Sequence, residues 1–382
     1  MLGRKAKILT FIAGTVFFTV LALAILTHVL ERKNSDEKYA DFFSQEEDFD
    51  VLFLGTSHVI NGVFPMEMWG DHGIVSYNIA GHANKLPVTY WTMINALDYT
   101  EPKLVVIDCL KIPDEIKTNE NLNYLHLSMD AFPLSVHKAE AVHDLLDDPY
   151  MPAHLKQFDG KYDLSERTAM RFLWNFSIYH ARWNKLNDKD TVFDEKYEKG
   201  AESRIGVSQT GESVSTNEIF AGETTGVRYL KKMLKECEKR DIEVLLTYLP
   251  YPAEEEDYAA ANRMEELADA YNVRSINFLK EDIVDPETDY YDEHSHLNPS
   301  GAKKVSAYLS DYITNYYDIP DRREDPAYVQ WDTDYEEYCD YKEETLVKQE
   351  KLDTYLMLLA DDDYEINVQV NDPIIYTSEK YS

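Results

Sequence analysis

The sequence predicts an α/β protein built on a doubly wound, parallel β-sheet. Three observations favour this class. Short apolar runs alternate with stretches of helical spacing, the first such run ends at a glycine followed by Thr-Ser-His, and the alternation returns late in the chain after an irregular middle part. Short, fully apolar runs separated by helices are typical of parallel strands that are buried on both faces.

The expected strands form an early and a late group. Residues 51–54 are four consecutive apolar residues between Asp50 and Gly55, and they give the clearest strand. The other expected strands are residues 74–80, 103–110, 242–249 and 273–279, and the expected helices between and after them are residues 86–97, 227–240, 254–271 and 302–316. Strands joined by helical crossovers form one sheet with right-handed connections, so residues 50–319 should make a single α/β domain.

Residues 111–226 interrupt the alternation. Two stretches, residues 125–146 and 164–186, have helical spacing, and residues 188–226 are polar and rich in turn formers. The segment 171–183 is dense in aromatic residues, which we expect to pack inside the protein. This part of the chain is therefore predicted to be a largely helical insertion that covers one end of the sheet.

The first 30 residues predict a membrane anchor. An uncharged apolar stretch follows Arg4, Lys5 and Lys7, and it is as long as the roughly 20 residues that cross a bilayer. A cleaved signal peptide is the alternative, but the stretch is long for one and no clear A-x-A site follows it. The basic residues before it favour a cytoplasmic N-terminus, with residues 31–49 as a tether and the rest of the chain outside the plasma membrane.

Charge and composition exclude several classes. The chain has 38 basic and 71 acidic residues, a formal net charge of -33, so it should repel nucleic acid. Its 3 cysteines form no C-x-x-C pair, and nothing in the sequence calls for a metal or another cofactor. Residues 320–382 are strongly acidic and rich in tyrosine, with helical spacing over residues 346–359, and we expect a small appended C-terminal module there.

The candidate site combines the two ends of the α/β domain. Ser57 follows the first strand and His296 precedes the last expected helix, so both should lie at the carboxyl edge of the sheet, where ligands of such folds bind. A serine hydroxyl needs a base to take its proton, and the base needs a third group to orient it; Asp292 and Glu293 are the nearby acids. His294, His296 and Asp292 could instead hold a metal, but no companion ligand pair is found.

These residues resemble the SGNH (GDSL-type) hydrolase superfamily. The resemblance rests on G-T-S-H at residues 55–58, Y-N-I-A-G at residues 77–81 and H-L-N-P-S-G at residues 296–301. Within the superfamily the chain looks most like membrane-anchored surface proteins of the DltD-like kind and related polysaccharide acyl-transfer proteins. The resemblance implies a flavodoxin-like doubly wound sheet, the SGNH hydrolase fold, over most of residues 50–316.

The resemblance also implies residue roles. Ser57 would be the nucleophile, His296 the base and either Asp292 or Glu293 the orienting acid, while His58 could contact substrate or simply make a local hydrogen bond. The oxyanion hole would use the backbone N–H of Ser57 with the Asn78 side chain or the Gly81 N–H. The sequence departs from the family pattern in one block: where G-x-N-D is expected after the third strand, residues 108–111 read D-C-L-K.

Two functions remain open at this stage. The first is an esterase or O-acyltransferase that acts on an acylated cell-envelope polysaccharide or teichoic-type polymer through an acyl-serine intermediate. The second is a non-catalytic accessory protein that supports a membrane-bound O-acyltransferase, a partner that the resemblance alone implies. A third and weaker idea gives the function to the acidic C-terminal module.

Overall fold

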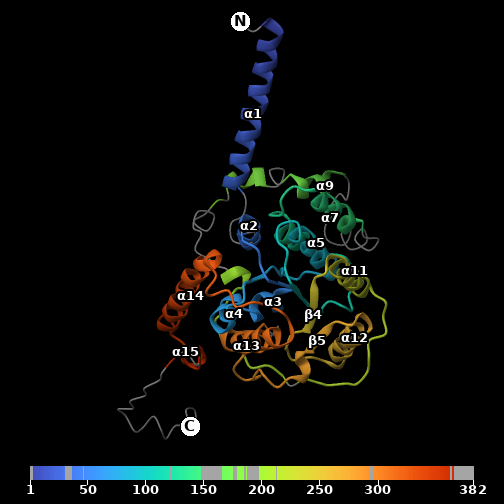
Figure 1. Ribbon diagram of the computed structural model, residues 1–382, viewed down its shortest axis with the longest axis vertical. Coiled ribbons are helices and arrows are strands. Elements are labelled where there is room, and N and C mark those ends of the chain that lie inside the picture. The colour runs from blue at the N-terminus through green and yellow to red at the C-terminus, as the bar shows by residue number, and fades with distance from the viewer. Residues whose placement is uncertain are drawn as a thin grey trace.

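The computed structural model describes residues 3–30, 37–45, 47–119, 122–147, 166–174, 179–184, 186, 198–211, 213–292, 296–361 and 364. A five-stranded parallel sheet forms its centre, in the order β2-β1-β3-β4-β5 (Figure 1). The strands are β1 Val51–Leu54, β2 Ser76–Asn78, β3 Leu104–Asp108, β4 Glu243–Tyr248 and β5 Arg274–Asn277. This order is one of the two common orders of doubly wound sheets, so the predicted α/β class is confirmed.

Alternating side chains of the strands build a core on each face of the sheet. Leu52 and Leu54 of β1 point into one cluster, which α5, α11 and α12 complete. Val51 and Phe53 point into the other, which α3, α4 and α13 complete. All four of these side chains are buried, as expected for a strand at the centre of a sheet that helices cover on both faces.

The helices lie close to the positions that the sequence predicts inside the α/β domain. Around the sheet they are α3 Ser57–Gly62, α4 Pro65–His72, α5 Leu86–Ala96, α11 Thr225–Arg240, α12 Glu255–Tyr271 and α13 Pro299–Tyr316, with the 3-10 helix η4 Phe278–Lys280 after β5. Several begin at residues that suit a helix start. Thr224 caps α11 by accepting from the Val227 N–H at 3.1 Å, and Asn298 caps α13.

The expected tether is partly wrong. Helix α2, Glu37–Ser44, lies within residues 31–49 and buries Tyr39 and Phe42 against the core next to β2. The Tyr77 hydroxyl on β2 donates a 2.7 Å hydrogen bond to the Lys38 carbonyl. Tyr39 and Phe42 are three residues apart, which is the spacing of an apolar face on an amphipathic helix. The many charged residues around this pair make the segment look like a polar tether in the sequence.

The insertion contains shorter helices than expected. Residues 125–146 form α6 Leu122–Met129 and α7 Val136–Leu146, separated around Pro133, with Ser135 accepting the Lys138 N–H as the cap of α7. The described part of residues 164–186 forms α9 Glu166–Leu173 and the 3-10 helix η1 His180–Asn184. A proline ends a helix and a capping serine begins one, so Pro133 and Ser135 explain why two helices replace the single one that the apolar spacing predicts. The aromatic segment is split, with Phe172 and Tyr179 buried but Trp174 and Trp183 exposed.

The C-terminal residues form two helices on the side of the domain. After the 3-10 helix η5 Pro326–Tyr328 come α14 Val329–Val347 and α15 Leu352–Leu359, so the single helix expected over residues 346–359 is wrong (Figure 1). Helix α14 packs against α4 and buries Trp331 and Tyr338, whose hydroxyl donates to Glu67 at 2.6 Å. Helix α14 therefore shares the core of the α/β domain, and α15 packs beside α13 and α14.

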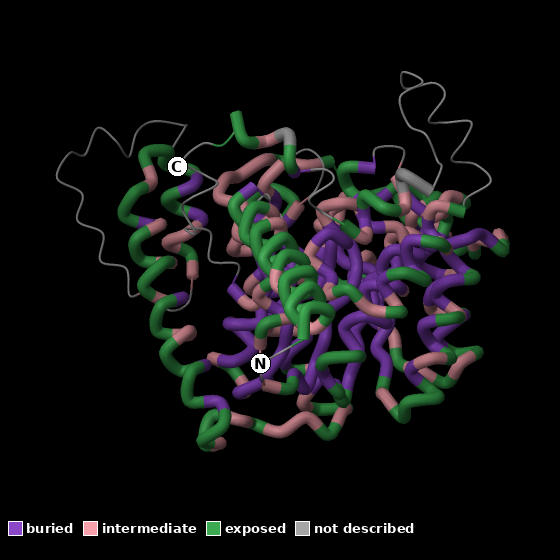
Figure 2. The backbone as a smooth tube through the Cα atoms, turned by 90° about the horizontal axis from the view of Figure 1, so that it is seen from above, coloured by how far each residue is buried: buried purple, intermediate pink, exposed green. Residues whose placement is uncertain are grey.

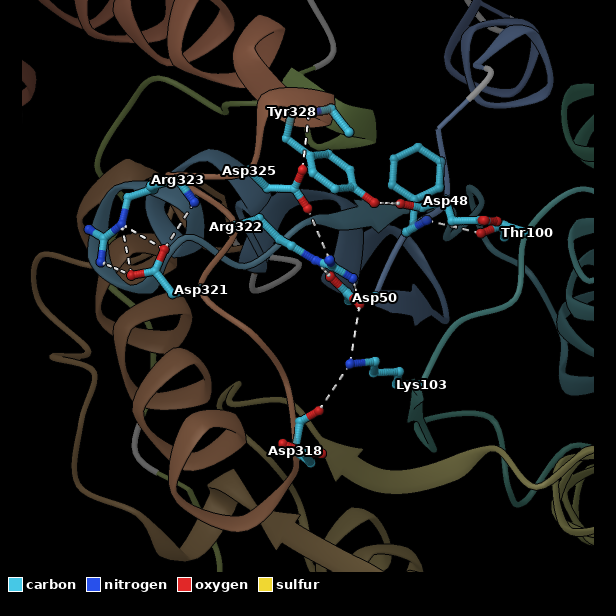
Figure 3. Close-up of polar contacts among 12 residues, drawn as sticks. Asp48, Asp50, Thr100, Lys103, Asp318, Asp321, Arg322, Arg323, Asp325 and Tyr328 are labelled. Carbon is cyan, nitrogen blue, oxygen red and sulfur yellow. Dashed lines mark hydrogen bonds and ion pairs between the residues drawn. The ribbon is translucent and has the colours of Figure 1, made fainter.

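The amino edge of the sheet carries a group of ion pairs and hydrogen bonds (Figure 3). Arg322 donates to both carboxylate oxygens of Asp50, at 2.8 and 3.0 Å, and to Asp325 at 3.2 Å. Lys103 lies 3.9 Å from Asp50, and the Tyr328 hydroxyl donates to the Asp48 carbonyl at 3.0 Å. These contacts fasten the segment between α13 and α14 to the start of β1.

Helix α1, Arg4–Leu30, projects away from the domain (Figure 1). Its 27 residues are long and apolar enough to cross a membrane, and a signal sequence would pass the same test. Along almost its whole length it is exposed, in contrast to the buried centre of the domain (Figure 2). At its end the Arg182 guanidinium donates to the Leu30 carbonyl at 2.7 Å, which joins α1 to the insertion.

Candidate active site

Ser57 lies at the carboxyl end of β1, an interior strand between β2 and β3. The strand stops at Gly55, where a Cβ atom would come within 2.8 Å of the Asp108 Cβ and 2.6 Å of the Val59 Cγ2, so only glycine fits. Thr56 then caps the short helix α3 by accepting from the His58 N–H at 3.2 Å. The sharp strand-to-helix transition puts Ser57 in the first turn of α3, partly exposed at the edge of the sheet.

Ser57, His296 and Asp292 form a continuous chain of side-chain contacts. The Ser57 Oγ lies 2.9 Å from the His296 Nε2. The other ring nitrogen, Nδ1, lies 3.0 and 3.2 Å from the two carboxylate oxygens of Asp292. Because a carboxylate favours a proton on Nδ1, Nε2 is left as the acceptor for the serine hydroxyl. This is the geometry of a nucleophile, its base and the group that orients the base.

The loop that carries His296 is held from both sides. Tyr290 and Leu297 form an antiparallel bridge, and Tyr291 N donates to the His296 carbonyl at 2.8 Å. The Asp292 carboxylate also accepts from the His296 backbone N–H at 3.2 Å. Acid and base are therefore four residues apart in the chain and are joined by contacts from both the backbone N–H and the ring of His296.

The H-L-N-P-S-G segment has a structural reason for each conspicuous residue. Asn298 accepts from the Gly301 N–H at 3.2 Å and donates to the Thr288 carbonyl at 2.7 Å, so it caps α13 and fixes the loop. Pro299 occupies the first turn, where its missing N–H has no consequence. A Cβ at Gly301 would come within 2.5 Å of the Asp289 carbonyl oxygen. These residues hold His296 in place.

Two residues expected at the oxyanion hole are engaged elsewhere. Asn78 is fully buried, and its amide donates to the carbonyls of Val59 and Val63, at 2.7 and 2.9 Å. Both of its N–H bonds therefore join β2 to α3 and none remains for a substrate. The Gly81 N–H donates to the Gly55 carbonyl at 3.2 Å. The Ser57 backbone N–H, which has no acceptor among the described residues, is the remaining donor of the expected set.

Glu293 and His294, two residues considered from the sequence, lie outside the described residues. The geometry therefore assigns a position to Asp292 and says nothing about Glu293. Within the described ranges, no group of three or more histidine, cysteine, aspartate or glutamate side chains is disposed to hold a metal ion.

His58 lies between His296 and Tyr251. Its ring centroid is 5.1 Å from that of His296 and 5.4 Å from that of Tyr251, both in edge-to-face arrangement. Burial lowers its pKa to about 3, and electrostatic interactions with His296 and Lys111 act in the same direction. The imidazole is therefore neutral under physiological conditions, with one ring nitrogen as an N–H donor and the other as an acceptor.

Asp108 ends β3 directly beside the start of the serine turn. It accepts from the Leu249 N–H at 3.1 Å and the Leu110 N–H at 3.4 Å, so it ties together the loops after β3 and β4. Burial raises its pKa to about 7, against the opposing effect of these two backbone donors. It occupies the place where the family block G-x-N-D was expected, and it contributes a buried carboxylate there.

Four charged or titratable side chains near the β2 side of the site were not predicted. His82 follows β2, Glu202 and Arg204 come from the segment after the 3-10 helix η3 Glu198–Gly200, and Lys38 comes from α2. Burial lowers the pKa of His82 to about 4, and the charges of Lys38 and Arg204 add to this effect. Arg204 pairs with Glu202 at 3.0 Å.

The segment that carries Glu202 is anchored to the serine helix. Glu202 N donates to the Ile60 carbonyl at 3.0 Å, and the Asn61 amide donates to the Glu202 carbonyl at 2.7 Å. Nothing in the polar, turn-rich sequence of residues 188–226 shows that part of it returns to α3. Only the long-range contacts reveal it, so a sequence-based search could not have found these residues.

Comparisons with known proteins do not identify the chain. No protein-family model matches this sequence, and no curated protein matches it. The fold and the geometry of the site are therefore the basis for the functional argument that follows.

Proposed function

We propose that this protein is a membrane-anchored serine esterase or O-acyltransferase, and that Ser57, His296 and Asp292 are its catalytic triad. The observation that carries the proposal is the chain of contacts from Ser57 Oγ to His296 Nε2, and from His296 Nδ1 to Asp292, at the carboxyl edge of a parallel sheet. A serine in the first turn of a helix needs no histidine at hydrogen-bond distance, and a structural histidine needs no serine. Together with an orienting carboxylate they match the requirements of nucleophilic catalysis.

The geometry supports a two-step acyl transfer. Ser57 Oγ attacks the ester carbonyl carbon while His296 Nε2 takes the hydroxyl proton, and the imidazolium is stabilised by Asp292. The tetrahedral intermediate collapses, the sugar oxygen leaves with the proton from Nε2, and an acyl-Ser57 ester remains. Water or a second sugar hydroxyl then attacks this ester with His296 again as base, which completes hydrolysis or transfer. The Ser57 N–H is the oxyanion donor that the described residues offer, and one such donor typically contributes roughly 100- to 1000-fold in rate.

The sequence motifs and the anchor support a more specific assignment. The order of Ser57, Asp292 and His296, together with the 2-1-3-4-5 sheet, resembles the SGNH hydrolases and their DltD-like branch. With α1 retained as a single transmembrane helix, the active domain would lie outside the plasma membrane and act on an acylated cell-envelope polysaccharide or teichoic-type polymer. Exposed Trp183 lies in η1, which contacts α1, and tryptophan favours a membrane–water interface.

One observation favours a second function. The Asn78 amide and the Gly81 N–H both donate to internal carbonyls, so neither is available as the second N–H donor of an oxyanion hole. A weak oxyanion hole would suit a non-catalytic accessory protein that supports a membrane-bound O-acyltransferase and binds its polymer or enzyme. This function keeps the fold, the anchor and the surface, and it requires no reactive serine.

The deciding experiment is covalent labelling of the detergent-solubilised full-length protein with a fluorophosphonate, together with hydrolysis of an aryl acetate. We expect the wild type to be labelled at Ser57 and to release acetate, and Ser57→Ala and His296→Ala to lose both activities. Ser208→Ala and His72→Ala are the matched controls, because Ser208 lies outside the triad and His72 forms a surface pair with Asp311 at 2.8 Å. A folded wild-type protein that is neither labelled nor active would contradict the enzyme and favour the accessory protein.

A further inference from the structure

A groove of about 750 Å³ opens beside the candidate triad, between the loops that follow β3 and β4. His58, Lys111, Phe220 and Tyr251 line it, and the first turn of α12 forms one wall. Helix α3 brings His58 into the groove one residue after Ser57. None of Ser57, Asp292 and His296 lines the groove itself; the groove adjoins the candidate triad through His58, the chain neighbour of Ser57.

One of the residues that line the groove, His58, carries an unsatisfied polar atom. The Nδ1 of His58 is buried and has no hydrogen-bond partner in the described structure. A buried polar atom without a partner typically costs about 1 to 3 kcal/mol, so a stable fold keeps one mainly where something else satisfies it. A neutral imidazole beside an aromatic ring, the Tyr251 ring, suits a sugar, whose hydroxyls hydrogen-bond and whose C–H face packs on aromatic rings.

The charge of the groove is negative. Four carboxylates, those of Asp114, Glu218, Glu256 and Asp257, lie among its lining residues against one cation, Lys111. The Asp114 carboxylate is partly neutralised by Lys85 at 2.8 Å, which lies outside the lining. Carboxylates in a cleft focus a negative potential, which repels anions and attracts cations.

We propose that this groove is the glycan-binding subsite of the protein, and that it accepts neutral or amino-sugar chains and rejects polyanionic ones such as phosphate-linked polymers. The inference rests on the proposed function, because it names the substrate class of the same site. Of the two polymer classes that the sequence leaves open, it selects the polysaccharide. Within the groove His58 is a positioning residue that hydrogen-bonds with a sugar hydroxyl.

The test measures binding and turnover separately, so that failure of the inference is distinguishable from failure of the enzyme. Binding to full-length Ser57→Ala protein in detergent would be measured by calorimetry with three oligosaccharides of similar length. These are a partly N-deacetylated chito-oligosaccharide (cationic), a xylo-oligosaccharide (neutral) and an oligogalacturonate (anionic). We expect the first two to bind at least 10-fold more tightly than the third at low salt, with a smaller difference at high salt.

Charge variants distinguish the local effect of the groove carboxylates on binding from the long-range effect of the acidic chain as a whole. Glu256→Gln, in the groove, should weaken binding of the cationic oligosaccharide about 3- to 10-fold and leave the neutral one less affected. Glu255→Gln is the matched control, since Glu255 lies in the same turn of α12 but does not line the groove. Equal effects of the two variants would show that long-range charge, and no local subsite, governs binding.

Variants of His58 test the unsatisfied nitrogen. His58→Phe keeps an aromatic ring and removes both nitrogens, and we expect it to weaken binding of the neutral oligosaccharide about 10-fold. His58→Gln restores a hydrogen-bonding group and should recover part of the loss. Unchanged binding in His58→Phe, with a free energy of unfolding no lower than in the wild type, would mean that the nitrogen serves no ligand.

Turnover completes the design. The ratio of kcat/KM for O-acetylated xylo-oligosaccharide to that for aryl acetate should fall in His58→Phe. Preferred binding of the anionic oligosaccharide, or equal binding of all three, would overturn the inference even if the aryl ester is hydrolysed. Selective binding without any ester hydrolysis would support the subsite and contradict the enzyme.

Discussion

The two edges of the central sheet use charged residues in opposite ways. At the amino edge, Asp50 is almost fully buried but satisfied by two hydrogen bonds from Arg322, with Lys103 nearby (Figure 3). At the carboxyl edge, a nitrogen of His58 has no partner and Asp108 is buried with a raised pKa. Paired charges at one edge stabilise the fold, whereas the other edge retains polar groups that are costly unless a ligand or a reaction uses them.

Among the variants that test this contrast, Asp292→Asn should have the largest effect, a loss of kcat. An asparagine keeps the size of the side chain but no longer stabilises the histidine cation or its correct tautomer, and such a change lowers kcat on the order of 10⁴-fold in a serine protease triad. We expect a comparable loss in aryl acetate hydrolysis, measured under saturating substrate, with unchanged thermal unfolding. Asp311→Asn, which disrupts the surface pair with His72, is the control and should leave kcat unchanged.

The alternative to this prediction is that Glu293, and not Asp292, orients His296. If Asp292→Asn retains most of the activity while Glu293→Gln abolishes it, the acid three residues before His296 orients the histidine. Loss of stability in Asp292→Asn comparable to that of an amino-edge variant would remove the contrast between the two edges.

At the amino edge, Arg322→Ala should lower stability without lowering activity. It leaves the buried Asp50 carboxylate with Lys103 alone, at 3.9 Å. Removing one partner of a buried pair costs about 3 to 5 kcal/mol, and because Arg322 is itself 27% exposed we expect about 2 kcal/mol. The free energy of unfolding from urea titration measures the change.

The neighbouring arginine supplies the matched control for this variant. Arg323 pairs with Asp321, but both side chains are about half exposed, at 42% and 50%. Arg323→Ala should therefore change the free energy of unfolding by less than about 1 kcal/mol. Equal losses in the two arginine variants would show that the amino-edge contacts are no stronger than an ordinary surface pair.

The remaining prediction concerns pH and Asp108. Its pKa of about 7 in the folded protein lies above the unfolded value of about 4, so its contribution to stability is full below pH 4 and is lost as pH rises through 7. Asp108→Asn removes this titration. We expect the free energy of unfolding of the wild type to fall, relative to the variant, by about 1 kcal/mol per pH unit between pH 5 and 7.

Urea titrations at three pH values would measure this difference. Glu198, whose pKa burial raises to about 8, titrates in both proteins and cancels from the comparison. A wild-type and a variant curve that run parallel over this range would mean that Asp108 is ionised in the folded protein. The carboxyl edge would then hold a stabilising charge, like the amino edge.

Sequence patterns could predict the sheet because most residues of its strands are buried, including all those of β1, β2 and β3. All five strands lie within the predicted apolar runs, and residues 51–54 are predicted without error, since Asp50 and Gly55 bound them on both sides. The insertion and the C-terminal part were less predictable because their helices are short. Pro133 interrupts one expected helix, and the Lys348 cap of α14 carries no strong stop signal at all.

For the site, residues next to strand ends could be predicted and residues on returning loops could not. Ser57 and His296 are placed by the topology of a doubly wound sheet, so their proximity follows from the order of the strands. Asn78 was proposed as an oxyanion donor because it lies at a strand end, but its amide points to the carbonyls of α3. Glu202 reaches the same region through a loop, and no local pattern encodes that path.

The junction between α1 and the domain sets how far the protein can work from its anchor. Only residues 31–36 separate α1 from α2, which is packed into the core, and six residues span at most about 20 Å when fully extended. In the anchored protein proposed above, the active site would therefore stay within a short distance of the bilayer surface. Polymer that has just emerged at the membrane would be within reach, and mature outer layers of the envelope would not.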